Sequence, residues 1–204
     1  MEIRVLVSDL GNVLLPLEPE RAYRALAAAS RHPEGIAERV RQVAVETGIG
    51  RGGASPEAFY QRLAAALGLQ LDFATFCRVW SDIFREDAAT VALVRQARVE
   101  RRYLLSNTDP IHWEWIRQRH PRVLEPFDAL FASHECGLEK PDPAIYRRVL
   151  AASGLPPAAH LYVDDLPEYV AAARAVGMDA VCFTGSDHLH GELVRRGLLA
   201  PETR

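Results

Sequence analysis

Polar side chains that suit phosphoryl chemistry occur at several places along the chain, most of them directly after a run of apolar residues. They comprise three carboxylates, a hydroxyl, an amide and an ammonium: Asp9, Asp164, Asp165, Ser106, Asn107 and Lys140. Carboxylate oxygens hold Mg²⁺, and Lys and Ser side chains hold phosphate oxygens. The set predicts a site for a divalent cation and a phosphoryl group, although each residue alone has an ordinary explanation as a turn, cap or loop residue.

Lysine and asparagine are rare in this chain. Of 24 Lys and Arg residues only Lys140 is a lysine, and the only asparagines are Asn12 and Asn107. Arginine serves wherever a solvated positive charge suffices, so the one lysine indicates a position that needs a compact ammonium. Drift in a composition rich in Arg and Ala is the alternative explanation, and the positions of these residues favour the functional one.

Short apolar segments of strand length position these residues. We expect strands at 3–8, 103–105, 129–133, 160–163 and 180–183, with helices that begin at Asp109-Pro110, Asp142-Pro143, Pro167 and His188. Alternating strands and helices predict a parallel sheet covered on both faces. The polar residues would then meet outside the carboxyl ends of the strands. We interpret Asp109 and Asp142 as helix N-caps without chemistry.

The segment from 19 to 99 has helical spacing of its apolar residues and no convincing strand. Ser55-Pro56 predicts a helix start, with Ser as N-cap and Pro in the first turn. Pro33 and Asp87 begin further helical patterns, and 48–53 is a flexible connection.

Composition excludes several classes of protein. A formal charge of -3 with 49% hydrophobic residues is typical of a globular protein, and there is no basic excess of the kind that nucleic-acid or membrane-surface binding requires. Three widely spaced cysteines indicate neither a disulfide framework nor a zinc site. With no signal-like or membrane-spanning segment, we expect a cytoplasmic protein that binds neither nucleic acid nor membrane.

Four motifs occur in a fixed order along most of the chain. They are VLVSDLGNVL at 5–14, LLSNT at 104–108, GLEKPD at 137–142 and YVDD at 162–165. Together they resemble the haloacid dehalogenase (HAD) superfamily, subfamily I, and within it the bacterial branch of the α-D-glucose-1-phosphate phosphatase. The resemblance implies a three-layer, Rossmann-like α/β core of residues 1–16 and 88–204, with a small helical cap of residues 17–87 inserted after the first strand.

The resemblance also implies a nucleophile and a metal site. Asp9 would attack phosphorus and form an aspartyl-phosphate that water hydrolyses. Mg²⁺ would be held by the Asp9 carboxylate, the main-chain carbonyl of Gly11 and the Asp165 carboxylate.

The remaining motif residues would hold the transferring phosphoryl group. Ser106 and Lys140 would bind its oxygens, with Asn107 and main-chain N–H groups completing the cradle. Asp164 would orient the metal shell or pair with Lys140.

Two positions depart from the family's pattern. The family's second aspartate, which is the general acid and base two residues after the nucleophile, is replaced by Gly11. Tyr169 stands where relatives often have an Asn or Asp that supports the lysine and the metal, and Glu168 beside it is the candidate to compensate. Such an acid typically contributes on the order of 10²–10⁴-fold. The branch of the α-D-glucose-1-phosphate phosphatase shares the Gly-Asn-Val run, and an anomeric phosphate has a fairly good leaving group.

Two alternatives follow from the missing acid. A 2-haloacid dehalogenase also lacks it, but needs no metal and carries Asp-x-Tyr-Gly-Thr rather than Asp-Leu-Gly-Asn-Val. A catalytically weakened, phosphate-binding regulatory protein has little need of an intact Asp9, Lys140 and Asp165. We therefore expect a Mg²⁺-dependent phosphomonoesterase for a small phosphorylated metabolite, with a sugar phosphate favoured. We expect its specificity residues at 15–24 and 48–59. By analogy with members of this size in the family that the chain resembles, we expect a monomer or homodimer.

Overall fold

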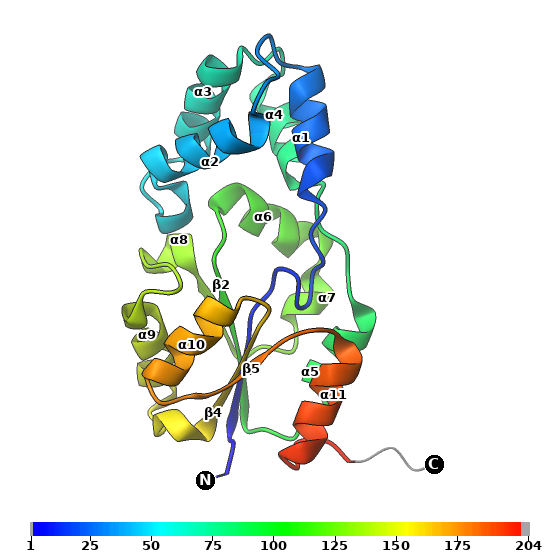
Figure 1. Ribbon diagram of the computed structural model, residues 1–204, viewed down its shortest axis with the longest axis vertical. Coiled ribbons are helices and arrows are strands. Elements are labelled where there is room, and N and C mark those ends of the chain that lie inside the picture. The colour runs from blue at the N-terminus through cyan, green and yellow to red at the C-terminus, as the bar shows by residue number, and fades with distance from the viewer. Residues whose placement is uncertain (1, 201–204) are drawn as a thin grey trace.

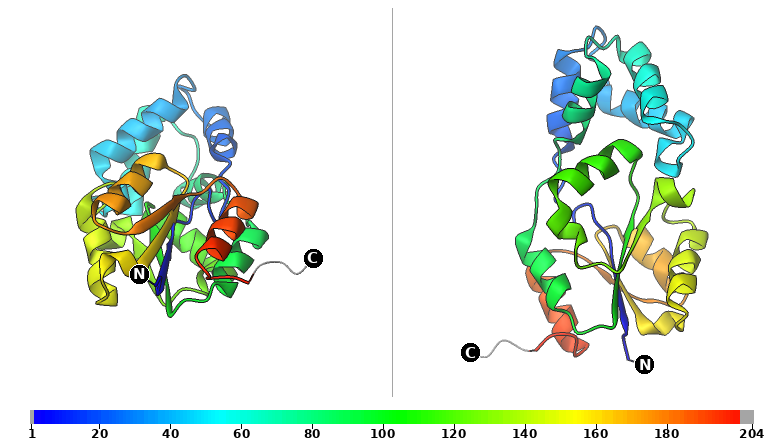
Figure 2. Two further views of the ribbon diagram at one scale, coloured as in Figure 1. Left: turned by 60° about the horizontal axis from the view of Figure 1, so that its bottom comes forward. Right: turned by 180° about the vertical axis from the view of Figure 1, so that it is seen from behind.

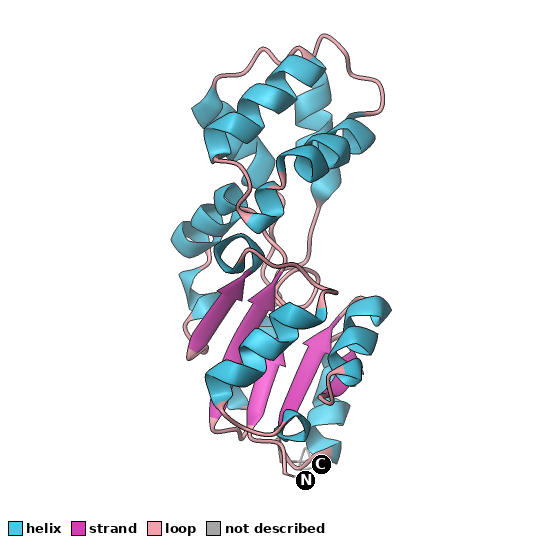
Figure 3. Ribbon diagram, turned by 90° about the vertical axis from the view of Figure 1, so that its left-hand side faces the viewer, coloured by secondary structure: helices cyan, strands magenta, loops and turns pink. Residues whose placement is uncertain are grey.

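A parallel β-sheet forms the centre of the protein. The computed structural model describes residues 2–200. The sheet has five strands in the order β3-β2-β1-β4-β5, so the first strand lies in the middle. Figure 3 shows the strands side by side and pointing the same way. Their bounds are β1 (Val5–Ser8), β2 (Arg101–Ser106), β3 (Ala129–Ala132), β4 (His160–Asp164) and β5 (Asp179–Cys182). In register, Val7 of β1 lies opposite Tyr103 of β2 and Tyr162 of β4.

Helices cover both faces of the sheet because its side chains alternate between two hydrophobic clusters. Leu6 and Leu104 pack on one face and Val7 and Tyr103 on the other. The first face is covered by α5 (Ala88–Gln96), α6 (Pro110–Arg119), α7 (Pro121–Leu124) and α11 (Ser186–Arg195). The second is covered by α8 (Ser133–Cys136), α9 (Pro143–Ser153) and α10 (Pro167–Ala175). The three-layer α/β fold that the sequence predicts is confirmed.

Further helices lie beyond the carboxyl ends of the strands, at the top of Figure 1 and of the right-hand view in Figure 2. We refer to them as the cap helices: α1 (Pro19–Ala28), α2 (Ile36–Thr47), the short 3₁₀ turn η1 (Ile49–Arg51), α3 (Pro56–Leu67) and α4 (Phe73–Ser81). They share a hydrophobic cluster in which Phe59, Phe76 and Trp80 are in aromatic contact. Ile111 of α6 joins this cluster and connects the cap helices to the rest of the protein.

Local capping explains why several helices begin where the sequence predicts. The side chains of Ser55, Asp109 and Asp142 accept hydrogen bonds from the first-turn N–H groups of α3, α6 and α9. The short helices α7, α8 and η2 (Pro157–Ala159) were not predicted. The predicted strand at 129–133 is one residue too long, because Ser133 begins α8. Within residues 2–200, no helix is both long and apolar enough to cross a membrane.

Candidate active site

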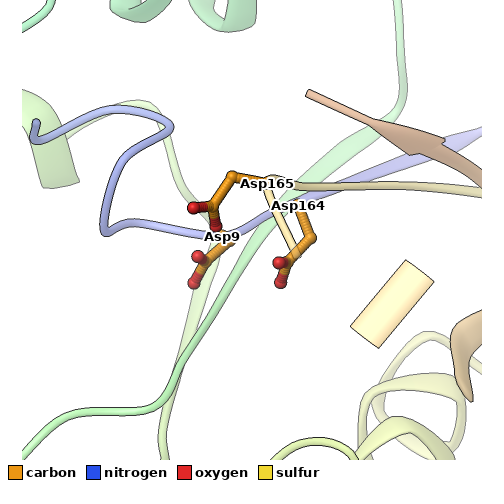
Figure 4. Close-up of side chains that lie close together, drawn as sticks. All are labelled: Asp9, Asp164 and Asp165. Atoms are coloured by element: carbon orange, nitrogen blue, oxygen red, sulfur yellow. The ribbon is translucent and has the colours of Figure 1, made fainter. Parts of the chain in front are cut away.

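Three carboxylates lie together at the carboxyl edge of the sheet. Asp9 directly follows β1, Asp164 ends β4, and Asp165 is the next residue. Each offers an oxygen atom within 4.8 Å of the others (Figure 4). Asp9 is 7% exposed. Burial raises the pKa of Asp9 to about 6, with Lys140 opposing the shift and Asp164 adding to it.

The ammonium of Lys140 pairs with two of these carboxylates. Its Nζ donates to Asp9 Oδ1 and to Asp164 Oδ2, at 2.7 Å each. The Lys140 side chain is only 1% exposed. Burial lowers the pKa of this lysine, but the two carboxylates outweigh burial and the net shift is upward. Lys140 is therefore a charged group inside the protein.

Both carboxylate oxygens of Asp164 accept hydrogen bonds from protein groups. Besides Lys140, Oδ2 accepts a hydrogen bond from the Tyr162 hydroxyl, and Oδ1 accepts one from the Leu166 N–H at 2.9 Å. Of the two arrangements expected for Asp164, the structure shows the pairing with Lys140.

Asn107 holds the main chain of Lys140. Its Nδ2 donates to the Lys140 carbonyl, and its Oδ1 accepts from the Lys140 N–H, both at 2.9 Å. Nδ2 also donates to the Tyr169 hydroxyl at 3.3 Å. Both amide hydrogens are therefore in use. Ser106, 3% exposed, reaches the same edge of the sheet as the last residue of β2.

The loop after Asp9 brings Asn12 to Asp165. Asn12 has φ 54°, a left-handed conformation that asparagine tolerates better than most residues. Its Nδ2 donates to Asp165 Oδ2 at 3.2 Å, and its Oδ1 accepts from the Leu17 N–H at 3.1 Å. Burial raises the pKa of Asp165. No role was predicted for Asn12 from the sequence, although the rarity of asparagine in this chain was a signal.

The position where the family's general acid would stand is narrow. A Cβ added to Gly11 would lie 3.3 Å from Leu17 Cδ1, which is tight for a carbon contact. A larger residue at Gly11 would require Leu17 to move.

A cavity of about 370 Å³ lies between α2 with η1 and the residues around the start of α6. It adjoins the site through Asn107, which lines it. The cap helices and their loop contribute Arg41, Ala44, Val45, Gly48, Ile49, Gly50 and Arg51, and the other wall is Asn107, Thr108, Asp109, His112 and Glu139. Of the two predicted specificity segments, 48–59 lines this cavity in part and 15–24 does not line it. Residues of α2 also line the cavity, which was not predicted.

Comparison with known families agrees with this fold. A family model described as haloacid dehalogenase-like hydrolase matches residues 3–177. The chain therefore belongs to the haloacid dehalogenase-like hydrolases, which confirms the predicted enzyme class.

Curated relatives include phosphatases. The sesquiterpene phosphatase astK of Aspergillus oryzae is 32% identical over 67% of this chain and 70% of its own length. The D-ribitol-5-phosphate phosphatase of Bacteroides thetaiotaomicron is 23% identical over 87% of this chain and 90% of its own length.

Solved structures share the fold. A HAD family enzyme from Bacteroides thetaiotaomicron, in complex with magnesium and inorganic phosphate, has a TM-score of 0.81 and 24% identity, covering 92% of this chain and 98% of its own. The L-2-haloacid dehalogenase of Xanthobacter autotrophicus has a TM-score of 0.63 and 21% identity, covering 97% of this chain and 85% of its own.

Proposed function

We propose that this protein is a Mg²⁺-dependent phosphomonoesterase that acts on a small phosphorylated metabolite through an aspartyl-phosphate at Asp9. The observation that carries the proposal is the buried carboxylate of Asp9, held by the chain's only lysine and within 4.8 Å of two further carboxylates. The phosphatases among the curated relatives support the reaction class.

The residues at the edge of the sheet fit a divalent cation. Three carboxylates face one ammonium, so the cluster has excess negative charge that a bound cation would neutralise. Asp9, Asp165 and the carbonyl of Gly11 would hold Mg²⁺, because hard oxygen ligands suit it. Bound there, Mg²⁺ would offset the repulsion between Asp9 and a phosphate dianion.

The protein's own groups would carry out the transfer. An oxygen of Asp9 forms the bond to phosphorus while the bond to the alcohol oxygen breaks, and water later releases phosphate from Asp9. Lys140 and Ser106 would hold the phosphoryl oxygens. Since both amide hydrogens of Asn107 are in use, its main-chain N–H is the group we propose for phosphate binding.

Gly11 limits the choice of substrate. Without an acid there, departure of the alcohol depends on its own basicity, so we propose substrates with good leaving groups. We propose a sugar phosphate as the substrate class. We also propose that the protein belongs to the branch of the α-D-glucose-1-phosphate phosphatase, because it shares that branch's Gly-Asn-Val run.

We further propose that residues 17–87 form a cap domain on a core of 1–16 and 88–204. In this arrangement the alcohol half of the substrate occupies the cavity between α2, η1 and α6, and the closed cap excludes water. We also propose that the protein is cytoplasmic and that it is a monomer or a homodimer.

The missing acid also favours a second candidate, a 2-haloacid dehalogenase activity in which Asp9 displaces halide from carbon. The adjacent acids Asp164 and Asp165 count against it, because that reaction needs no metal cluster. A phosphate-binding regulatory protein without turnover is the third candidate.

The test is phosphate release from sugar phosphates, nucleotides and p-nitrophenyl phosphate, with Mg²⁺ and with EDTA. We expect release that requires Mg²⁺ and that falls by more than about a thousandfold in Asp9→Asn, because the nucleophile is lost. Release that persists in Asp9→Asn would remove the proposed nucleophile. Silence across the panel, with turnover of 2-chloropropionate, would favour the dehalogenase.

A further inference from the structure

Tyr169 contacts the ammonium of Lys140. The residue lies in the first turn of α10, and the centre of its ring is 4.9 Å from Lys140 Nζ. The ring of Tyr162 is on the same ammonium at 5.9 Å. Nζ thus has carboxylate partners in Asp9 and Asp164 and aromatic partners in two tyrosines.

The hydroxyl of Tyr169 reaches the other end of the same residue through Asn107. Asn107 Nδ2 donates to the Tyr169 hydroxyl at 3.3 Å, while the same amide group holds both the N–H and the carbonyl of Lys140. One side chain therefore supports both the ammonium and, at one remove, the main chain of Lys140.

Tyr169 is itself fixed by its surroundings. Its carbonyl accepts a hydrogen bond from the Tyr146 hydroxyl at 3.1 Å, and its N–H donates to Leu166. The N–H of Leu166 in turn donates to Asp164. Tyr146 packs edge-on against Tyr162, with ring centres 5.5 Å apart. The tyrosines and Asp164 form a connected group around the lysine.

Such contacts matter because a lysine side chain is intrinsically flexible. Ordering this side chain costs rotamer entropy, and a cation–π contact that is shielded from water offsets part of that cost. With two of the three N–H groups of Lys140 donated to carboxylates, the direction of the third depends on how the ammonium is held.

We propose that Tyr169 is a positioning residue for Lys140, its ring holding the ammonium and its hydroxyl holding Asn107, so that the third N–H is directed to a phosphoryl oxygen. The sequence identified Tyr169 as a departure from the family's pattern, and its neighbour Glu168 is exposed, so the support for Lys140 comes from the ring. The effect on catalysis rests on the proposed phosphatase function, whereas the contact itself does not.

The single lysine allows a direct test. Untagged full-length protein labelled with ¹³C and ¹⁵N only in lysine gives one set of side-chain NMR signals, those of Lys140. We expect the Lys140 ε-proton signals to be shifted upfield by the rings, to stay shifted in Tyr169→Phe, and to move downfield in Tyr169→Leu. Tyr169→Met, which also lacks the ring, serves if Tyr169→Leu does not fold.

Kinetics test the consequence in the same variants. We expect Tyr169→Leu to lower kcat about 30-fold, the equivalent of one desolvated cation–π contact, with a smaller change in KM. Tyr169→Phe keeps the ring and loses only the hydroxyl that holds Asn107, so it should lower kcat by about threefold, well short of the loss in Tyr169→Leu. A purely structural role would lower the melting temperature without this split between kcat and KM.

The two readouts separate the inference from the function beneath it. If wild type releases no phosphate from any substrate, the proposed function fails and the NMR shift still decides the contact. Lys140 signals that do not move in Tyr169→Leu, or an active wild type whose kcat is unchanged by that substitution, would overturn the inference. A Tyr169→Phe loss equal to that of Tyr169→Leu would also overturn the part assigned to the ring.

Discussion

At the scale of single residues, the buried ammonium of Lys140 balances the carboxylates of Asp9 and Asp164. A buried pair of this kind adds little net stability when complete, but loss of one member leaves an uncompensated charge inside the protein. The same ammonium thus has a structural and a proposed catalytic part, which two kinds of measurement can separate.

Lys140→Met is expected to lower the free energy of unfolding by about 3–5 kcal/mol, because two buried carboxylates lose their partner. It is also expected to abolish phosphate binding, because the ammonium proposed to hold the phosphoryl oxygens is gone. Urea denaturation in EDTA measures the first effect and calorimetry with inorganic phosphate and Mg²⁺ the second. Arg51→Met is the control, since it breaks a half-exposed pair with Glu139 at 3.6 Å and should cost at most about 1 kcal/mol. Equal losses in both variants would refute the buried-charge argument.

Asp165 gives a prediction for the metal. Added Mg²⁺ should raise the melting temperature and EDTA should reverse the rise, because a ligand that binds only the folded state stabilises it. Asp165→Asn should remove most of this rise, whereas Asp187→Asn, at an exposed position in the first turn of α11, should retain it. A full Mg²⁺-dependent rise in Asp165→Asn would exclude Asp165 as a ligand.

At the scale of elements, α4 and α6 are joined by a buried polar contact that the sequence did not predict. Besides capping α6, Asp109 accepts a hydrogen bond from Trp80 Nε1 at 3.2 Å and lies 3.0 Å from His112 Nδ1. The His112 ring stacks on Trp80 at 4.9 Å. The sequence pattern identifies Asp109 as the N-cap of α6, but not its contact with Trp80, which lies on a different helix.

This contact predicts a pH dependence of stability. Burial lowers the pKa of His112, but Asp109 outweighs burial and the net shift is upward. A histidine whose pKa is higher in the folded state contributes stability that is complete below its unfolded value of about 6.5 and is lost as pH rises through the folded value. Melting temperatures at pH 6 to 9 should therefore fall more steeply in wild type than in His112→Gln.

Exposed His188 of α11 provides the comparison. His188→Gln should reproduce the wild-type dependence on pH. If His112→Gln and wild type gave parallel curves above pH 6.5, the pair of His112 and Asp109 would not be the source.

At the scale of the whole molecule, the cap helices contact the rest of the protein where η1 meets α8. The Ser133 hydroxyl lies 2.6 Å from the Gly50 carbonyl and accepts from the Thr108 N–H at 2.9 Å. A Cβ added to Gly52, which has φ 71°, would lie 2.5 Å from the His134 carbonyl oxygen. The approach of the two parts therefore depends on a glycine.

Gly52→Ala is expected to lower kcat/KM by about tenfold to a hundredfold, because the added methyl group displaces the cap helices from α8 and a shift of about 1 Å in a site is costly. Gly35→Ala is the control, with a similar φ of 64° and nothing within 4 Å of the added Cβ. In both variants the free energy of unfolding should fall by about 1–2 kcal/mol, because alanine disfavours the left-handed conformation. Equal kinetics in the two variants would show that docking at Gly52 is not required.

From the sequence alone, the alternation of strands with the longer helices could be predicted, together with the parallel sheet and the edge at which chemistry-bearing residues gather. These features follow from local causes: apolar runs of strand length, caps such as Ser55 and Asp142, and the geometry that brings the carboxyl ends of parallel strands together. Composition also set Lys140 apart, and the structure places its ammonium at that edge, paired with Asp9 and Asp164.

Only the tertiary structure decided which of these residues touch and how they divide their hydrogen bonds. Asn107 proved to clamp Lys140 with its amide, Tyr169 to cover the ammonium, and α2 to line the cavity beside the site. The physical reason is range: Lys140 lies 131 residues from Asp9 and 33 from Asn107. Side-chain contacts over such separations depend on how helices pack against the sheet, which no local pattern encodes.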